Sequence, residues 1–185
     1  SRSLGKQVAD YYQSIACDLL FGKRGLRLEE EALIESLTNR GNRAAIQAEL
    51  LRLKQEYVQR GRSIPKELCY LQNDWRDAYL QDMQLCQVFA QENRRQIRDT
   101  ILKHLDLLER QSETDSFESV HNYIDLASNI VRKGAIDASA GKRVLIPLNM
   151  RDGCILAIGK GNADWNCSAP HGAGRLMSRT EAKKR

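Results

Sequence analysis

Apolar residues recur at helical spacing through the first part of the chain. One helix is predicted before Gly22 and Gly25, because apolar side chains three or four positions apart share one of its faces: Val8, Tyr12, Ile15 and Leu19. Two further helices, separated by Gly41, are predicted to form a hairpin at about 28–60. A longer helix is predicted over about 74–109. The first part of the chain is therefore expected to be helical.

The pattern changes after residue 111. A polar loop is predicted over 112–119, and short β-prone runs bounded by glycine or proline follow at 129–132, 143–146 and 154–158. The fold class expected is α+β, with a helix-rich part over about 1–110 packed on a mixed strand and loop part.

Composition sets limits on the kind of protein. The 185 residues are 42% hydrophobic and 29% charged, which is typical of a globular protein. No apolar run approaches the roughly 18 residues of a membrane span, so no membrane partner is expected. The five cysteines are scattered without a Cys-x-x-Cys pair, which argues against a disulfide framework or a zinc site and fits a reducing cytoplasm.

The charge is concentrated near one end. The formal net charge is +5, and residues 171–185 hold five lysines or arginines against one acid, Glu181. Such a field attracts phosphate, but a solvated tail would have the same composition. Charge alone leaves the two possibilities open.

The segment with the clearest chemistry places His171 directly before the turn Gly172–Gly174. Glycine lets backbone N–H groups approach an anion, and a neutral imidazole can attack phosphorus. Arg175 and Arg179 would share one face of a following helix and suit a phosphodiester chain. The alternative is a glycine turn with an incidental histidine.

Two other histidines carry less information. His121, followed by Asn122, could bind a metal ion, but one ligand cannot hold a metal that needs three or four. His104 falls within the long predicted helix and is interpreted as a packing or surface residue.

Four motifs occur in an order that resembles the RtcB family of RNA ligases, and the resemblance extends over nearly the whole chain. They are Ser1–Gln7 (SRSLGKQ), His121-Asn122, Arg132–Ala135 (RKGA) and Ser168–Arg179, which contains His-Gly-Ala-Gly-Arg-x-Met-Ser-Arg. The chain departs from better-known members at Pro170, where they often have cysteine, and over 148–152, where they often have Gly-Ser-Met-Gly-Thr.

The resemblance implies an enzyme of RNA repair or tRNA splicing. The family joins RNA ends bearing a 3′-phosphate or 2′,3′-cyclic phosphate to 5′-hydroxyl ends, using GTP and Mn²⁺. It implies that His171 becomes covalently attached to GMP, that His121 binds the metal, and that Asn122 contacts the nucleotide. The backbone positions implied to contact the guanylate are Gly172, Ala173 and Gly174. The phosphate-binding positions implied are Arg2, Arg175 and Arg179.

The resemblance also implies that residues 1–185 are one partial catalytic domain. The family's other metal ligands match nothing in the chain, so the 185 residues alone are expected to be inactive. One alternative is a non-catalytic RNA-binding paralogue that keeps the arginines. Another is a helical scaffold protein, which leaves 168–179 unexplained.

Overall fold

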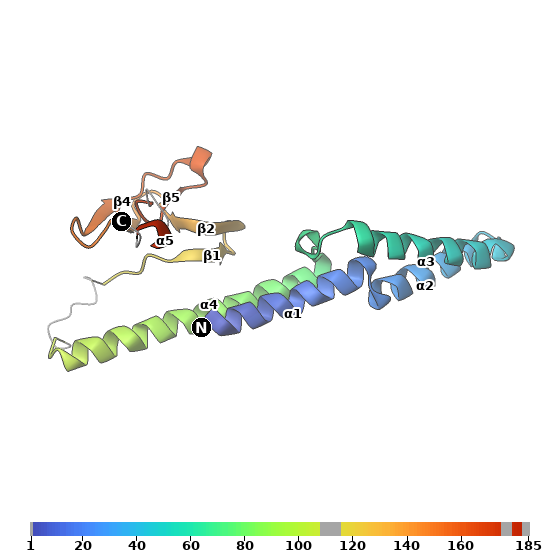
Figure 1. Ribbon diagram of the computed structural model, residues 1–185, viewed down its shortest axis with the longest axis horizontal. Coiled ribbons are helices and arrows are strands. Elements are labelled where there is room, and N and C mark those ends of the chain that lie inside the picture. The colour runs from blue at the N-terminus through green and yellow to red at the C-terminus, as the bar shows by residue number, and fades with distance from the viewer. Residues whose placement is uncertain (1, 108–115, 175–178, 183–185) are drawn as a thin grey trace. The chain divides into compact units, whose positions relative to one another are not determined.

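The computed structural model describes residues 2–107, 116–174 and 179–182. The chain has the α+β class expected from the sequence and divides into two compact units, Ser1–Arg94 and Arg95–Arg185 (Figure 1). No helix among these residues is long and apolar enough to cross a membrane. That the whole chain belongs to one catalytic domain stays a prediction.

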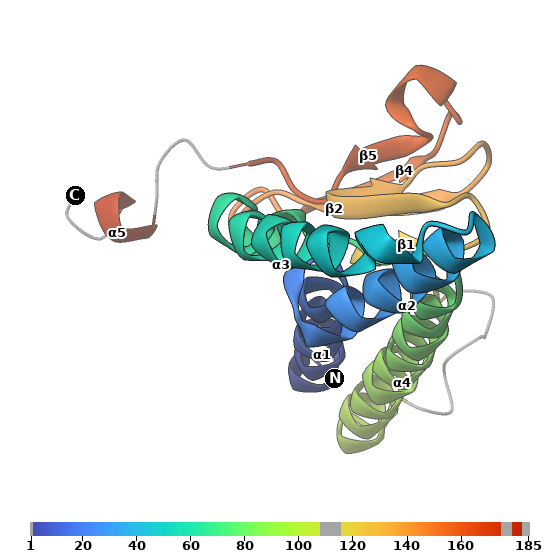
Figure 2. The same ribbon diagram turned by 90° about the vertical axis from the view of Figure 1, so that its right-hand side faces the viewer.

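Helices make up the first unit. In chain order they are α1 (Arg2–Phe21), α2 (Lys23–Asn39), the short 3-10 helix η1 (Arg43–Ala45), α3 (Ile46–Ser63), the 3-10 helix η2 (Lys66–Leu68) and α4 (Asn73–His104), which continues past Arg94 into the second unit. The antiparallel helices α2 and α3 lie side by side in both ribbon views (Figures 1 and 2). The hairpin therefore extends over 23–63, and α4 ends five residues before the predicted 109.

Gly22 and Gly25, both predicted to end the first helix, have different roles. Gly22 alone separates α1 from α2. Gly25 lies inside α2, where it is buried and where an added Cβ would collide with the Leu19 carbonyl oxygen. Gly25 is required by the close approach of α1 and α2, because any larger residue would push these helices apart.

The α1–α4 contact is centred on a buried tyrosine. Tyr12 is 6% exposed, its hydroxyl donates to Asp82 Oδ2 at 2.8 Å, and its ring meets that of Tyr79 edge-on. The hydrogen bond to Asp82 and burial raise the pKa of Tyr12 to about 12. Near the same helix, the free thiols of Cys17 and Cys69 have their Sγ atoms 3.2 Å apart.

The second unit contains two small antiparallel sheets (Figure 2). The first has the order β1 (His121–Asp125), β2 (Ile130–Asp137), β5 (Ser168–Pro170), and the second pairs β3 (Arg143–Pro147) with β4 (Cys154–Ile158). A 3-10 helix, η5 (Ala163–Trp165), and the short helix α5 (Arg179–Ala182) complete the described elements. Ile136, Ala138 and Val144 form the buried core.

The strand predictions are correct in position but incomplete. β3 and β4 lie within one residue of their predicted bounds, whereas β2 runs five residues beyond the predicted 129–132. β1 and β5 were not predicted, because His121-Asn122 and the Ser168–Pro170 triplet lack apolar alternation. Of the predicted loop, residues 112–115 lie outside the described residues, and 116–119 are neither helix nor strand.

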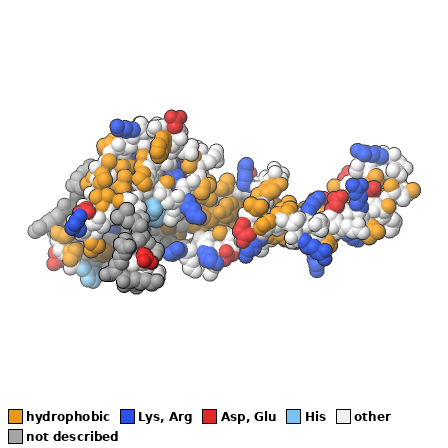
Figure 3. Space-filling view, turned by 45° about the horizontal axis from the view of Figure 1, so that its top comes forward, with side chains coloured by type: hydrophobic (Ala, Val, Ile, Leu, Met, Phe, Trp, Pro, Cys, Tyr) orange, Lys and Arg blue, Asp and Glu red, His pale blue; other side chains and the backbone are white. Residues whose placement is uncertain are grey.

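The second unit also carries exposed apolar surface, where hydrophobic side chains gather over the sheets (Figure 3). Every residue of β4 is exposed, including Leu156 at 68%. The buried core of this unit is therefore confined to one side of the β3–β4 ladder.

Candidate functional site

The site is built where the start of β1, the middle of β2 and the end of β5 meet. His121, the first residue of β1, pairs with Ile136 of β2. Pro170, which directly precedes His171, pairs with the neighbouring Ala135. The two histidines, 50 positions apart in the chain, are thereby brought together, with ring centroids 4.7 Å apart and planes inclined at 37°.

The His171 ring is held by a backbone carbonyl. Its Nδ1 atom lies 2.7 Å from the Gly134 oxygen, and the His171 backbone N–H donates to the same oxygen at 3.4 Å. A carbonyl oxygen only accepts, so the neutral ring must carry its proton on Nδ1. The Nε2 atom is then left with a free lone pair, the form required of a nucleophile or a metal ligand.

Gly134 is itself fixed by a side chain of β1. Its backbone N–H donates to Asn122 Oδ1 at 2.6 Å. Gly134 has a positive φ of 70°, and an added Cβ would stand 3.6 Å from the His171 ring. Asn122 also has a positive φ, 58°, a conformation that asparagine tolerates better than most residues. Asn122, Gly134 and His171 thus form a continuous chain of hydrogen bonds.

The glycine turn after His171 is anchored to β3. The Ala173 N–H donates to the Pro147 carbonyl at 3.2 Å, and a Cβ on Gly172 would meet the same oxygen at 3.5 Å. Within the described part of the chain, the N–H groups of Gly172 and Gly174 have no hydrogen-bond partner. Two amides beside His171 are therefore available to an anion, whereas the Ala173 amide is already engaged.

A buried arginine connects the strands that form the site. The Arg132 side chain is 2% exposed and pairs with Asp125 at 2.6 Å and with Asp137 at 3.8 Å. It also donates to Ser168 Oγ at 3.0 Å and to the Asn166 carbonyl at 3.3 Å. One guanidinium thus ties β1 and β2 to the segment that leads into His171. In the sequence Arg132 stands out only as part of a motif, and the signal for its buried role is the pair of aspartates, Asp125 and Asp137, on either side of it in the chain.

The carboxylates around Arg132 are held in their charged form. Burial alone would raise the pKa of Asp137, but hydrogen bonds from Lys142 and Ser139 outweigh it and lower this pKa to about 2. Hydrogen bonds from Ser128 and Arg132 lower the pKa of Asp125. The ion pairs of Arg132 with Asp125 and Asp137 therefore stay charged at neutral pH.

None of the three predicted phosphate-binding arginines is among the described residues of the second unit that form this site. Arg2 begins α1 in the first unit. Arg175 lies outside the described residues, and Arg179 is described only as the first residue of α5. Their role stays a prediction.

A metal ion finds only part of a site here. Among the residues that the structure describes, no three His, Cys, Asp or Glu side chains are grouped so that they could hold a metal. His121 and His171 supply two imidazoles, fewer than the ligands of most protein metal sites. The described residues alone therefore do not fit a Mn²⁺ centre.

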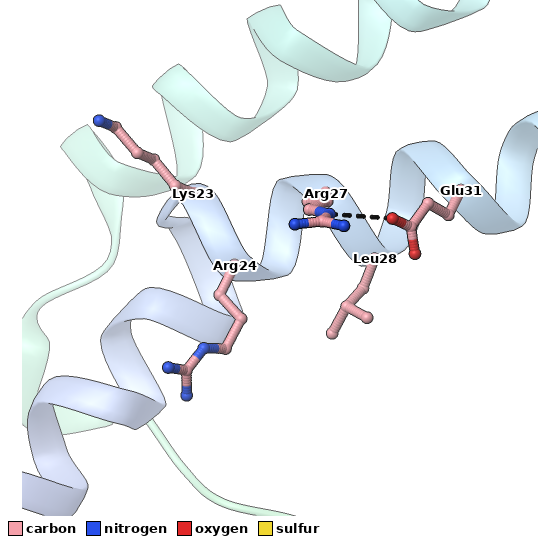
Figure 4. Close-up of a pocket in the computed structure, with 5 residues that line it drawn as sticks. All are labelled: Lys23, Arg24, Arg27, Leu28 and Glu31. Carbon is pink, nitrogen blue, oxygen red and sulfur yellow. Dashed lines mark hydrogen bonds and ion pairs between the residues drawn. The ribbon is translucent and has the colours of Figure 1, made fainter.

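A basic hollow at the start of α2 is a weaker candidate. Figure 4 shows it lined by Lys23, Arg24, Arg27, Leu28 and Glu31. Arg27 pairs with Glu31 at 2.9 Å, and Asp18 accepts from the backbone N–H of Arg24 at 3.2 Å and lies 3.6 Å from its guanidinium. Glu31 and Asp18 thus already lie beside Arg27 and Arg24, and Asp18 also accepts from an N–H at the start of the helix. The charge of the hollow therefore does not indicate a site for an anion.

Comparison with known proteins agrees with the motifs. The family model described as tRNA-splicing ligase RtcB matches residues 1–185. RNA-splicing ligase RtcB of Escherichia coli strain K12 is 34% identical over 134 residues, which cover 64% of this chain and 33% of that protein. RNA-splicing ligase RtcB1 of a second Escherichia coli strain is 33% identical over 134 residues, with the same coverage. The match thus spans about a third of the length of these relatives, and no solved structure matches the chain. The motifs and the family match over every residue lead to one conclusion, that this chain belongs to the RtcB family.

Proposed function

We propose that the full-length protein is a GTP-dependent RNA ligase in which His171 carries GMP during the reaction. The observation that carries the proposal is the orientation of His171, whose Nδ1 is held by the Gly134 carbonyl, so that the neutral ring keeps its unprotonated lone pair on Nε2. The amides of Gly172 and Gly174, directly beside it in the chain, have no hydrogen-bond partner among the residues that the structure describes. Both relatives are named RNA-splicing ligases, which supports the same reaction class.

In the first step His171 Nε2 attacks the α-phosphorus of GTP. A phosphorus–nitrogen bond forms, the bond from the α-phosphorus to the oxygen bridging to the β-phosphate breaks, and pyrophosphate leaves. No proton has to move, because Nε2 attacks with a lone pair and Nδ1 keeps its hydrogen. The ring becomes positively charged, so its hydrogen bond to the Gly134 carbonyl strengthens as the reaction proceeds.

The remaining steps pass the nucleotide to RNA. An oxygen of the RNA 3′-phosphate attacks the phosphorus of the bound GMP, and His171 leaves with its electron pair on Nε2. The 5′-hydroxyl of the second RNA then attacks the activated 3′-phosphate, GMP leaves, and a phosphodiester bond joins the two ends. A 2′,3′-cyclic phosphate would enter after water opens it to the 3′-phosphate.

Other groups are assigned supporting roles in this proposal. Gly172 and Gly174 donate backbone N–H groups to the guanylate, with Ala173 between them. Asn122 contacts the nucleotide, and Arg2, Arg175 and Arg179 bind phosphates of the nucleotide or RNA. His121 would be one ligand of Mn²⁺, which supplies charge neutralisation when it is bound. The described residues provide no complete metal site, and the steps above depend only on the chain's own groups and the substrates.

The test is label transfer from GTP to the full-length protein. With Mn²⁺ and GTP labelled at the α-phosphate, the wild-type protein should take up acid-labile label, and the His171→Ala variant should take up none. His104→Ala is the matched control, because the His104 Nδ1 also lies 2.8 Å from a backbone carbonyl, that of Thr100, but on the exposed face of α4. Equal labelling of His171→Ala and wild type would refute the proposal.

A further inference from the structure

We infer that Asn122 is a positioning residue for His171, acting through the backbone of Gly134. This inference rests on the proposed function and adds to it a role that is separate from contact with the nucleotide. Two hydrogen bonds carry it: the Gly134 backbone N–H donates to Asn122 Oδ1, and the His171 Nδ1–H donates to the Gly134 carbonyl.

The first link arises from an irregularity in the β1–β2 ladder. His121 pairs with Ile136 and Tyr123 with Arg132, so one residue of β1 faces three residues of β2. Gly134 is the middle residue of those three. Its N–H therefore has no backbone partner on β1, and the Asn122 side chain takes that place at 2.6 Å. In the described structure the Asn122 oxygen is what holds this amide.

The second link joins the Gly134 carbonyl to His171, the residue that follows β5. The Gly134 carbonyl receives both the Nδ1–H of the His171 ring and the backbone N–H of His171. Glycine at a positive φ has a broad range of accessible conformations, so its carbonyl direction is not fixed by its own backbone. A side-chain acceptor that clamps the Gly134 amide restricts the direction in which this carbonyl points.

The direction of the Gly134 carbonyl sets the direction of the lone pair on His171 Nε2. The attacking Nε2 lies across the ring from Nδ1, so a shift of the Gly134 carbonyl tilts the lone pair away from phosphorus. A misplacement of about 1 Å can cost about a hundredfold in rate even where the substrate stays bound. Loss of the Asn122 acceptor should therefore slow guanylylation by roughly ten- to a hundredfold at saturating GTP, in addition to any rise in the half-saturating GTP concentration from the lost nucleotide contact.

Two substitutions separate the side-chain acceptor from the backbone. Asn122→Gly removes the acceptor and still accepts the φ of 58°, so no strain is added. Asn122→Asp keeps an oxygen that can accept from Gly134 and also tolerates this φ. The matched control is Asn129→Gly, because exposed Asn129 has a φ of 54° and no recorded side-chain hydrogen bond among the described residues.

The experiment measures single-turnover guanylylation of full-length protein over a range of GTP concentrations, together with hydrogen–deuterium exchange of the peptide that contains Gly134. We expect Asn122→Gly to lose rate and to exchange faster at Gly134, whereas Asn122→Asp keeps slow exchange and Asn129→Gly behaves as wild type. A higher half-saturating GTP concentration at an unchanged maximal rate, or unchanged Gly134 exchange in Asn122→Gly, would overturn the positioning role. Wild-type labelling of His171→Ala would instead overturn the proposed function, so the two failures are distinguishable.

Discussion

The Nδ1 atom of His171 lies 2.7 Å from the carbonyl oxygen of Gly134, a residue 37 positions earlier in the chain. This contact determines which ring nitrogen carries the proton, because a carbonyl can only accept a hydrogen bond. It also connects two sequence motifs, Arg132–Ala135 and Ser168–Arg179, that have no evident relation along the chain. The free Nε2 atom that results is the basis of the proposed guanylylation.

The buried cluster around Arg132 predicts a large loss of stability when the cation is removed. Arg132→Met would leave Asp125 and Asp137 without their shared cation in a site where the Arg132 side chain is 2% exposed. Breaking a buried ion pair in this way costs roughly 3–5 kcal/mol. Urea denaturation of the full-length protein should show this loss. In the control Arg151→Met, whose 90% exposed side chain pairs with Asp152, the change should stay below about 1 kcal/mol, and equal effects would contradict the account.

Stability should also fall in acid because of Asp137. The pKa of Asp137 is lowered to about 2 in the folded protein, so its ionised carboxylate stabilises the fold at pH values above the ordinary pKa of an aspartate. This contribution is lost as the pH falls from about 4 to about 2. Thermal unfolding measured at a series of pH values should show the decline. Lys142→Met, which removes the hydrogen bond and ion pair from Lys142 to Asp137, should shift the decline to higher pH. An identical pH profile for this variant would contradict the assignment.

Replacing either of two helical glycines with alanine should change the stability of the protein, in opposite directions. Gly5→Ala has open space in α1 and should stabilise the protein by about 0.5–1 kcal/mol through helix propensity. Gly25→Ala would collide with the Leu19 backbone and should destabilise it by about 1–3 kcal/mol or more. Their unfolding midpoints provide the measurement. A stabilised Gly25→Ala variant would show that α1 and α2 do not require this close approach.

Sequence patterns predicted the helices better than the site. Helical spacing along α1, α3 and α4 marked these elements, since each buries one apolar face. Gly25 was misread, because a glycine that ends a helix and one that allows close packing look alike in sequence. The link from Asn122 to Gly134 depends on a shift of strand register, which is set by tertiary contacts and has no local pattern. His171 could be singled out as a candidate because its glycine-rich context is local, and its catalytic role stays a prediction.

The arginines after the glycine turn should act on RNA through charge. Arg175→Ala and Arg179→Ala should each remove a phosphate contact worth roughly 1.5–3 kcal/mol and reduce the salt dependence of RNA affinity by about one unit of slope. Fluorescence anisotropy with a labelled RNA at several salt concentrations measures both. Arg27→Ala is the control, because Arg27 is paired with Glu31 and should leave the slope unchanged. An unaltered slope in both test variants would mean that these residues do not bind phosphate.

The 185-residue chain assayed alone should take no GMP and bind Mn²⁺ no better than about millimolar, because metal binding needs several ligands in fixed geometry. Among the described residues only His121 and His171 place metal-binding groups together at the site. Isothermal titration with Mn²⁺ and a labelling assay measure both properties. Micromolar binding together with self-labelling would show that the chain holds a complete site.

The most direct test of the central claim is to locate the bound nucleotide. Full-length protein incubated with GTP and Mn²⁺, digested without acid and analysed by tandem mass spectrometry, should carry GMP on the peptide containing His171, with fragment ions placing it on that side chain. The same adduct should appear in His104→Ala and be absent in His171→Ala. GMP on a different residue, or an adduct that persists in His171→Ala, would contradict the account.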